Sequence, residues 1–321
     1  MALAPVLALG AYSCALGGAI DKEIQSTPRD PATGVVRGTE AIDLGDPDSP
    51  AACLLLHGFV GSRKDFGDLG ERLAEAGHFV RLTRLPGHGT TPRALAELDP
   101  EGWLIGARTE LEALKERFGR VYVIGFSLGG TLGTLLAAEQ GIDRLVLVSP
   151  YYRVAYSGWY ILPPEVWNRL FRRWVGFVPK GSRFIKVNRA EAKMELYSYR
   201  YVPTGAVAGL IRLGRRAASP DTLGRIHCPT LMLVSEGDEA ASPKASREVF
   251  ERLAGSEKSL HVYGSRSNHH LILDHDGEDV KARILAFLTA PLEALPEAPA
   301  SPPAKDPVSA EGGQDFPTPR G

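Results

Sequence analysis

The residues from Val121 to Gly130 constrain the fold of this chain more than any other stretch. They begin with a short apolar run, residues 121–124, which is typical of a buried strand. The sequence Gly125-Phe-Ser-Leu-Gly129 follows, and a helical pattern rich in Leu and Ala comes next. A sharp turn between strand and helix holds its serine in a strained conformation with the hydroxyl exposed, and flanking glycines let the two backbones pass closely. The stretch therefore predicts that Ser127 is an exposed nucleophile.

An acid and a histidine are needed to support this interpretation, because glycine is abundant here (35 residues) and the motif alone could be a flexible turn. Asp238 stands just past an apolar run, and His269 and His270 stand in the loop after the next strand. Serine needs a base to take its proton, imidazole titrates near neutrality, and a carboxylate behind the imidazole fixes its tautomer. The order Ser, Asp, His is that of nucleophile-elbow hydrolases. The residues leave open which histidine is the base, and weaker candidates for the acid are Glu236, Glu239, Asp274 and Asp276.

Apolar runs alternate with amphipathic helical patterns over most of the chain. Strands are expected near 38–44 and at 52–56, 79–85, 121–124, 145–148, 229–234 and 259–263, and helices at 65–76, 101–118, 131–140, 242–253 and 278–288. Continuous apolar strands that alternate with helices are typical of a parallel sheet covered on both faces. The sequence therefore predicts an α/β core, formed by residues 51–150 and 218–290, with a mostly parallel central sheet.

A loop with the sequence His57-Gly-Phe-Val-Gly61 follows the strand at 52–56. Glycines directly after a buried strand let the backbone approach a ligand. In elbow enzymes such a loop supplies one backbone N–H of the oxyanion hole, and the residue after the serine supplies the other. We therefore expect the N–H groups of Phe59 and Leu128 to form this hole. His57 and His88 are expected to brace loops by hydrogen bonds.

Residues 151–217 interrupt the alternation. This segment contains 13 of the chain's 25 aromatic residues, and 13 Lys or Arg against three acids. An insertion at the carboxyl edge of a parallel sheet lies over the site at that edge, so we expect a helical cap. An aromatic, basic cap suits an apolar substrate and contact with an anionic lipid surface. Alternatively, its aromatic residues form the cap's own core and its charges are solvated.

The two ends of the chain differ in character from the core. Residues 1–20 carry no charge and are long enough to cross a bilayer, although Pro5 and several glycines weaken that reading and no basic signal-peptide region precedes them. They are expected to be a membrane anchor, or else a leader or loose apolar tail, so the protein is either membrane-anchored or cytoplasmic. Residues 21–50 form a polar extension. Residues 291–321, rich in Pro and Ala, predict a disordered tail.

Overall composition excludes several classes of function. The net charge of −1 gives no electrostatic case for binding nucleic acid. The three cysteines form neither a disulfide framework nor a zinc spacing, so we expect no structural metal. No feature of the sequence defines an oligomeric state.

Together these motifs resemble the α/β-hydrolase superfamily, and within it the bacterial carboxylesterase and monoacylglycerol lipase group, which is also placed with serine aminopeptidase (S33-like) hydrolases. The matching sequences are His57-Gly-Phe-Val-Gly61, Pro86-Gly-His-Gly89, Gly125-Phe-Ser-Leu-Gly-Gly130, Gly237-Asp238 and Asn268-His-His-Leu-Ile-Leu-Asp274. In that group the catalytic histidine is commonly followed by apolar residues and an acid five positions on. The resemblance therefore selects His269 over His270, with Asp274 at the fifth position.

The resemblance implies an activity as well as a fold. It implies that Ser127, Asp238 and His269 hydrolyse a small-molecule or lipid-like carboxylic ester through an acyl-enzyme, without a metal or organic cofactor. Thioesters, amides, peptides and carbon–carbon bonds are alternative substrates of the same three residues. A catalytically silent binding module, and a protein whose main role is membrane docking, are the remaining alternatives. A serine in the elbow argues against epoxide or carbon–halogen cleavage, for which the superfamily uses an aspartate.

Overall fold

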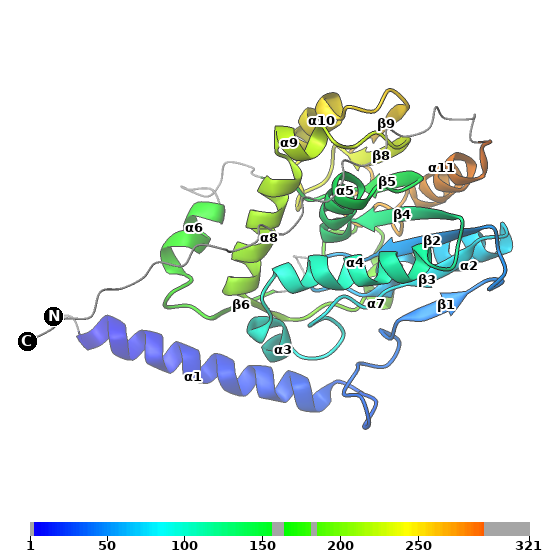
Figure 1. Cartoon of the computed structure of the whole chain (residues 1–321). Helices are drawn as coiled ribbons and strands as arrows, with labels where there is room; N and C mark the ends of the chain where they lie inside the picture. The colour runs from blue at the N-terminus through cyan, green and yellow to red at the C-terminus, as the bar shows by residue number, and fades with distance from the viewer. Residues whose placement is uncertain (1–2, 156–163, 181–184, 292–321) are drawn as a thin grey trace, which may run out of the picture. The chain divides into compact units, whose positions relative to one another are not determined.

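A seven-stranded sheet forms the centre of the protein (Figure 1). The computed structural model describes residues 3–155, 164–180 and 185–291. The strands, in spatial order, are β1 (Ile42–Leu44), β3 (Phe79–Leu82), β2 (Ala51–Leu56), β4 (Arg120–Phe126), β5 (Arg144–Val148), β8 (Thr230–Ser235) and β9 (Lys258–Tyr263). Only β1 pairs antiparallel with its neighbour in this sheet; all other pairs are parallel. The predicted α/β fold with a mostly parallel sheet is therefore confirmed.

Helices cover both faces of this sheet with two separate apolar layers. One layer includes α4 (Glu101–Lys115), α5 (Leu128–Gln140), α9 (Pro220–Leu223) and α10 (Pro243–Arg252). The other includes α2 (Leu69–Glu75) and α11 (Gly277–Thr289). Strands β2, β4 and β5 are buried on both faces, apart from Arg120 at the start of β4. This double burial explains why their sequences are continuous apolar runs rather than alternating ones.

The helix expected at residues 65–76 is two elements. A 3-10 helix, η1 (Arg63–Phe66), ends at Gly67, whose φ is +55°, and α2 then begins at Leu69. A left-handed conformation of this kind favours glycine and stops the helix. The apolar spacing of Phe66, Leu69 and Leu73 continues across the break because all three pack into the same layer, which is why the pattern looked continuous.

The cap region is not purely helical, which corrects the prediction. It contains α6 (Pro164–Phe171), α7 (Ala190–Glu195) and α8 (Thr204–Ala217), but also a two-stranded antiparallel ribbon of β6 (Phe177–Pro179) and β7 (Tyr201–Pro203). Each of these strands has three residues and ends in proline. Strands this short are below the length at which an alternating pattern can be recognised.

The N-terminal segment, expected to be an anchor or a leader, forms part of α1 (Leu3–Ser26). Its later turns contact α3 (Pro92–Glu97) through an ion pair of 2.8 Å between Asp21 and Arg93. No helix in the described part of the chain is long and apolar enough to cross a membrane. The tail predicted to be disordered lies outside the described residues from position 292 onward.

Candidate active site

Ser127 stands at the junction between β4 and α5. Its φ of +54° and ψ of −114° lie outside the usual regions for a residue with a side chain. A Cβ atom on Gly125 would overlap the backbone of Gly129, and one on Gly129 would overlap the Leu56 carbonyl. The turn is therefore as tight as the sequence predicted, and it requires glycine at both flanking positions.

A continuous chain of hydrogen bonds links Ser127, His269 and Asp238. Ser127 Oγ lies 2.9 Å from His269 Nε2, and His269 Nδ1 lies 2.7 Å from Asp238 Oδ2. The other carboxylate oxygen of Asp238 accepts hydrogen bonds from the N–H groups of Ala240 and Ala241, both at 2.8 Å. Ser127, His269 and Asp238 are each only 7% exposed. The structure thus brings together the three residues singled out in the sequence, with the serine at one end and the buried acid at the other.

The neighbouring histidine takes a different position. His270 Nδ1 faces Asp65 Oδ1 at 3.9 Å and makes no contact with Asp238. Burial holds the pKa of His270 well below its usual range, so its imidazole is neutral. Of the two histidines, only His269 bridges Ser127 and an acid.

The weaker candidates for the acid are all engaged elsewhere. Glu236 pairs with Arg247, and Glu239 pairs with Lys186 at 2.6 Å. Asp276 bonds to Ser267, and Asp274 accepts only backbone N–H groups. None of these carboxylates contacts His269 in the described structure.

The two expected oxyanion donors lie next to Ser127. Leu128 is the first residue of α5, so its N–H has no acceptor within the helix and points, with the positive end of the helix dipole, out of the N-terminus. Phe59 lines the cavity over Ser127, and none of the described residues accepts a hydrogen bond from its N–H. Neither N–H group therefore has an acceptor among the described residues.

Buried side chains hold the loop that carries Phe59. Gly58 N–H donates to Asp65 Oδ2 at 2.9 Å. His57 Nδ1 donates to the Gly58 carbonyl, and its Nε2 accepts from Leu85 N–H at 3.1 Å, which fixes the tautomer. Burial lowers the pKa of His57 to about 4, so the ring stays neutral. His57 thus ties the loop to the segment after β3, at Leu85, as a bracing role requires.

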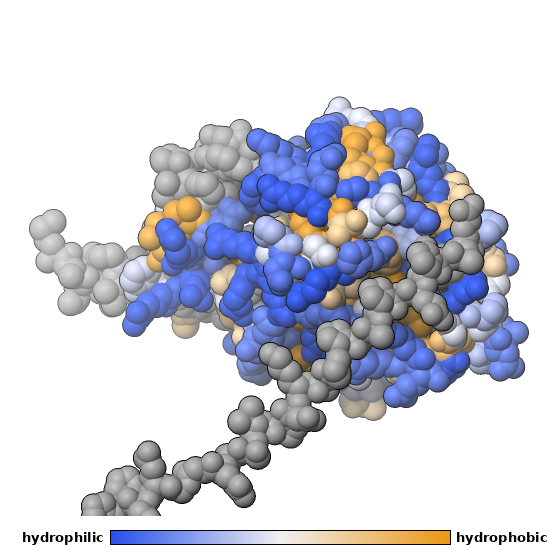
Figure 2. Space-filling view, turned by 45° about the horizontal axis from the view of Figure 1, so that its top comes forward, coloured by the Kyte–Doolittle hydropathy of each residue, from blue (hydrophilic) through white to orange (hydrophobic). Residues whose placement is uncertain are grey.

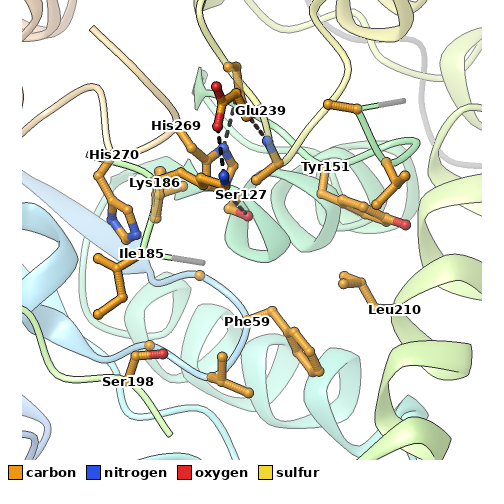
Figure 3. Close-up of a pocket in the computed structure, with 18 of the residues that line it drawn as sticks. Phe59, Ser127, Tyr151, Ile185, Lys186, Ser198, Leu210, Glu239, His269 and His270 are labelled. Carbon is orange, nitrogen blue, oxygen red and sulfur yellow. Dashed lines mark hydrogen bonds and ion pairs between the residues drawn. The ribbon is translucent and has the colours of Figure 1, made fainter. Parts of the chain in front are cut away.

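A cavity of about 1040 Å³ opens over Ser127. Figure 3 shows Phe59, Tyr151 and Leu210 on one side of Ser127, and His270, Ile185 and Ser198 on the other. We call the first group the apolar side. Asp65 and Lys180 also line the second side, where Asp65 contacts His270 and Lys180 contacts Ser198. We call Asp65, His270, Lys180 and Ser198 the polar side. No group of three or more His, Cys, Asp or Glu side chains among the described residues is arranged to hold a metal ion.

Sequence reasoning missed most residues of the polar side. In the sequence, Asp65 stands at the start of a predicted amphipathic helix, and Lys180 is one of many basic residues in the cap. One feature of the sequence could have indicated that Asp65 is buried. It is a carboxylate next to Phe66 in a segment whose other inward-facing positions are apolar. For Lys180 there was none, because its place depends on how the cap folds back over the sheet.

The fold and this hydrogen-bonded site define a serine hydrolase of the α/β-hydrolase class, and comparison with known proteins agrees. Residues 47–276 match the family model described as serine aminopeptidase, S33. A thermostable monoacylglycerol lipase of Bacillus sp. (strain H-257) is 29% identical over 247 residues, which cover 75% of this chain and 91% of that protein. A carboxylesterase of Bacillus subtilis (strain 168) is 25% identical over 243 residues, covering 74% and 92% respectively. The structure of Paleococcus ferrophilus monoacylglycerol lipase has the same fold, with a TM-score of 0.66, 21% identity, and coverage of 77% of this chain and 97% of that one.

The family match spans more than half of the chain. The protein therefore belongs to the serine aminopeptidase S33 family of α/β-hydrolases, as the sequence motifs had indicated.

Proposed function

We propose that this protein hydrolyses carboxylic esters through an acyl-enzyme on Ser127, with His269 as the base and Asp238 as its orienting acid. The observation that carries the proposal is the unbroken hydrogen-bonded chain from Ser127 Oγ through His269 to Asp238, at the floor of a cavity. The relatives described as a monoacylglycerol lipase and a carboxylesterase support the choice of an ester as the bond that is broken.

The geometry supports a two-step reaction. Ser127 Oγ attacks the ester carbonyl while His269 Nε2 takes its proton, and Asp238 stabilises the resulting imidazolium. The N–H groups of Phe59 and Leu128 bind the oxyanion, each contributing roughly 3 kcal/mol by analogy with measured donors. The imidazolium then gives its proton to the leaving alcohol, and the acyl group remains on Ser127. A water molecule, deprotonated by His269, releases the acid and restores the serine.

The substrate proposed is a small-molecule or lipid-like ester. The apolar side of the cavity, formed by Phe59, Tyr151 and Leu210, suits an acyl chain. Thioesters, amides, peptides and carbon–carbon bonds remain within the chemistry of a serine nucleophile, whereas the two Bacillus relatives are described as a monoacylglycerol lipase and a carboxylesterase. A silent binding module is disfavoured because a binding role has no need for a strained Ser127 hydrogen-bonded to His269.

The first test is hydrolysis of p-nitrophenyl esters from acetate to palmitate by the wild type and by Ser127→Ala. We expect activity in the wild type and its loss, by three or more orders of magnitude in kcat, in the variant, because the nucleophile is missing. Retained activity in Ser127→Ala would remove Ser127 from the mechanism. The optimum in chain length separates an esterase from a lipase.

We also propose that the cap contacts anionic lipid surfaces. The side chains of Trp167, Phe171 and Trp174 are exposed by 38%, 44% and 59%, and the first two rings stack at 5.1 Å. Arg169, Arg172 and Arg173 are exposed on the same short segment. Figure 2 shows a small hydrophobic area over α6 among hydrophilic side chains. Aromatic rings with adjacent arginines suit the interface of a membrane that carries negative lipids.

Flotation with phosphatidylglycerol vesicles tests this contact. Binding should weaken with salt and fall in Trp167→Ser/Trp174→Ser, whereas hydrolysis of a soluble ester by that variant should not change. A variant lacking residues 1–16 separates any contribution of the first turns of α1 from that of α6. Equal binding to neutral vesicles, or no dependence on the two tryptophans, would count against the cap as the contact.

A further inference from the structure

The loop that carries Phe59 is strained. Gly61 N–H donates to the Gly58 carbonyl at 3.1 Å, which closes a turn over residues 58–61. Val60, in the third position of this turn, has a φ of +56°. Turns with a positive φ at that position normally carry Gly or Asn there, and a β-branched residue is a conformational outlier. Strain of this kind persists only where the surrounding structure holds it, and it gathers at functional sites.

Asp65 holds the inner side of this loop. Its Oδ2 accepts a hydrogen bond from Gly58 N–H at 2.9 Å, and its side chain is 1% exposed. A Cβ atom on Gly61 would overlap the same oxygen, and one on Gly58 would lie 3.2 Å from it. The two glycines therefore leave space for the carboxylate, which packs against the backbone at both ends of the turn.

Tyr199 holds the same loop from the cap. This residue is 1% exposed, and its N–H donates to the Val60 carbonyl at 3.3 Å. Its hydroxyl donates to the Gly87 carbonyl and accepts from Thr90 N–H, both at 2.8 Å. The two hydroxyl contacts fix the tyrosine to the loop that follows β3, so its own N–H meets the strained residue at a fixed place.

Phe59 lies between these two attachments. The residue before it is bonded to Asp65, and the residue after it is bonded to Tyr199. The backbone is therefore fixed on both sides of the Phe59 N–H. A donor to an oxyanion is effective only if it is already in place when the charge develops, so small displacements of this N–H would reduce the rate.

We propose that Asp65 and Tyr199 are positioning residues, which hold the strained loop so that the Phe59 N–H is directed at the oxyanion of the reaction. This inference rests on the proposed ester hydrolysis at Ser127. Both residues act through the backbone of the loop rather than by contact with the ester.

A positioning role has its own kinetic signature. A displaced donor weakens binding of the oxyanion but not of the uncharged ester, and both the acylation and the deacylation step pass through an oxyanion. The values of kcat and kcat/KM should therefore fall together while KM changes little. An alkyl trifluoromethyl ketone adds to a serine nucleophile and forms a tetrahedral oxyanion, so its Ki should rise by the factor by which kcat falls.

The first experiment compares Asp65→Ala and Asp65→Asn with the wild type on p-nitrophenyl butyrate at pH 8. Burial raises the pKa of Asp65 to about 7, so the carboxylate is ionised at this pH. Complete loss of one oxyanion donor costs about 100-fold or more in kcat, so a displaced donor in Asp65→Ala should cost roughly tenfold, with a matching rise in Ki. Asparagine can still accept from Gly58 N–H, so Asp65→Asn should recover most of the activity.

The second experiment uses Tyr199→Phe, which keeps the ring but loses the contacts with Gly87 and Thr90. We expect kcat to fall severalfold and Ki to rise by the same factor. Tyr152→Phe is the matched control, because Tyr152 is also buried but its hydroxyl contacts Thr134 in α5. This control should leave both values as they are in the wild type.

Asp143→Ala is the matched control for the carboxylate. Asp143 Oδ2 accepts from Val121 N–H at 2.7 Å, at the opposite end of β4 from Ser127. The variant should lower the midpoint of urea denaturation but leave kcat and Ki unchanged. It therefore separates the loss of a structural hydrogen bond from a displacement of the oxyanion loop.

Several outcomes would overturn the inference. They are unchanged kcat and Ki in Asp65→Ala, a fall in kcat without a rise in Ki, and equal losses in Asp65→Ala and Asp65→Asn. If Asp65→Ala does not fold, Tyr199→Phe decides, because unchanged values there would equally refute the clamp. Absence of hydrolysis by the wild type, or its survival in Ser127→Ala, would instead refute the proposed function itself.

Discussion

Asp274 shows how one side chain holds two distant segments together. Its Oδ2 accepts from the N–H groups of Asn188 in the cap and Asn268 in the histidine loop, at 2.7 and 2.8 Å. Its Oδ1 accepts from Arg189 and His275, at 2.9 and 3.0 Å. The residue is 2% exposed. A carboxylate suits this place because all four partners are donors, so neither oxygen can be replaced by a donor without conflict.

Replacing Asp274 with asparagine should therefore destabilise the protein. The new amide turns an NH₂ group toward backbone N–H donors and leaves them unpaired, which costs about 2–4 kcal/mol in the free energy of unfolding. Because Asn268 precedes His269, the Ser127–His269 contact should loosen and kcat should fall as well. Urea denaturation and ester hydrolysis measure the two effects. Asp221→Asn is the control, since Asp221 is 81% exposed in its pair with Arg225 and should change stability by less than about 0.5 kcal/mol. A variant as stable as wild type would contradict the role given to Asp274.

At the scale of single residues, the sequence predicted the candidate nucleophile, acid and base, because nucleophile-elbow enzymes carry these three residue types in a fixed order along the chain. Ser127, Asp238 and His269 each follow a strand that could be recognised, and parallel strands end at one edge, so their meeting follows from topology. The choice between His269 and His270 needed the family pattern, because two adjacent histidines are equivalent in composition. Asp65 and Lys180 could not be predicted as a pair, because their approach depends on the fold of the cap rather than on any local pattern.

The turn from β4 into α5 leaves no room for a side chain at its flanking glycines. The α-carbon of Gly129 passes so close to the end of β2 that a Cβ atom would collide with the Leu56 carbonyl, which is backbone and cannot rotate away. The cavity, the serine and the Leu128 N–H all depend on this approach. The turn thus couples the packing of a helix on a sheet to the geometry of a site.

Gly129→Ala should consequently abolish labelling of Ser127 by a fluorophosphonate and destabilise the fold. The clash forces α5 away from β2, with a loss of at least about 3 kcal/mol, as overpacking at a rigid contact implies. The control is Gly205→Ala in α8, where an added Cβ meets no atom within 4 Å. That variant should label normally and gain roughly 0.5 kcal/mol from helix propensity. Normal labelling of Gly129→Ala would show that the turn is looser than the structure indicates.

Strands were predicted correctly where burial on both faces of the sheet produces a continuous apolar sequence, and they were missed where no such sequence exists. Strands β2, β4, β5 and β8 were recognised because every inward and outward position is apolar apart from their polar ends. The ribbon of β6 and β7 was missed because a strand of three residues bounded by proline has no pattern to read. The aromatic residues of the cap differ in burial: Tyr199 is fully buried, whereas Trp174 is exposed.

At the scale of the whole molecule, several histidines are buried and neutral, whereas in water the same side chains would take up a proton near pH 6.5. His57 and His88 lie next to each other with ring centroids 5.0 Å apart, and His88 also contacts Trp103. Burial lowers their pKa values to about 4 and about 3, and that of His270 falls in the same direction. The pKa of Asp65 shifts in the opposite direction, because burial raises it to about 7. Folding stability must therefore depend on pH through these groups.

The direction follows from which state binds more protons. Between about pH 4 and pH 6.5 the unfolded chain protonates all three histidines while the folded protein does not, so stability falls as pH falls through this window. Asp65 binds its proton in the folded state over much of the same window, so it offsets one of the three. Among these four groups the net difference of about two protons contributes a loss of at most about 3 kcal/mol per pH unit.

Denaturation midpoints at pH 5 and pH 7 measure this dependence, and His88→Asn identifies its source. Asparagine can still donate to the Pro86 carbonyl, which His88 Nδ1 contacts at 3.0 Å, but it does not titrate. The difference in stability between the two pH values should shrink in this variant by up to about 1.4 kcal/mol per pH unit. If His88→Asn kept the full difference, or if the wild type were equally stable at both pH values, the buried histidines would not be the groups that make the fold sensitive to acid.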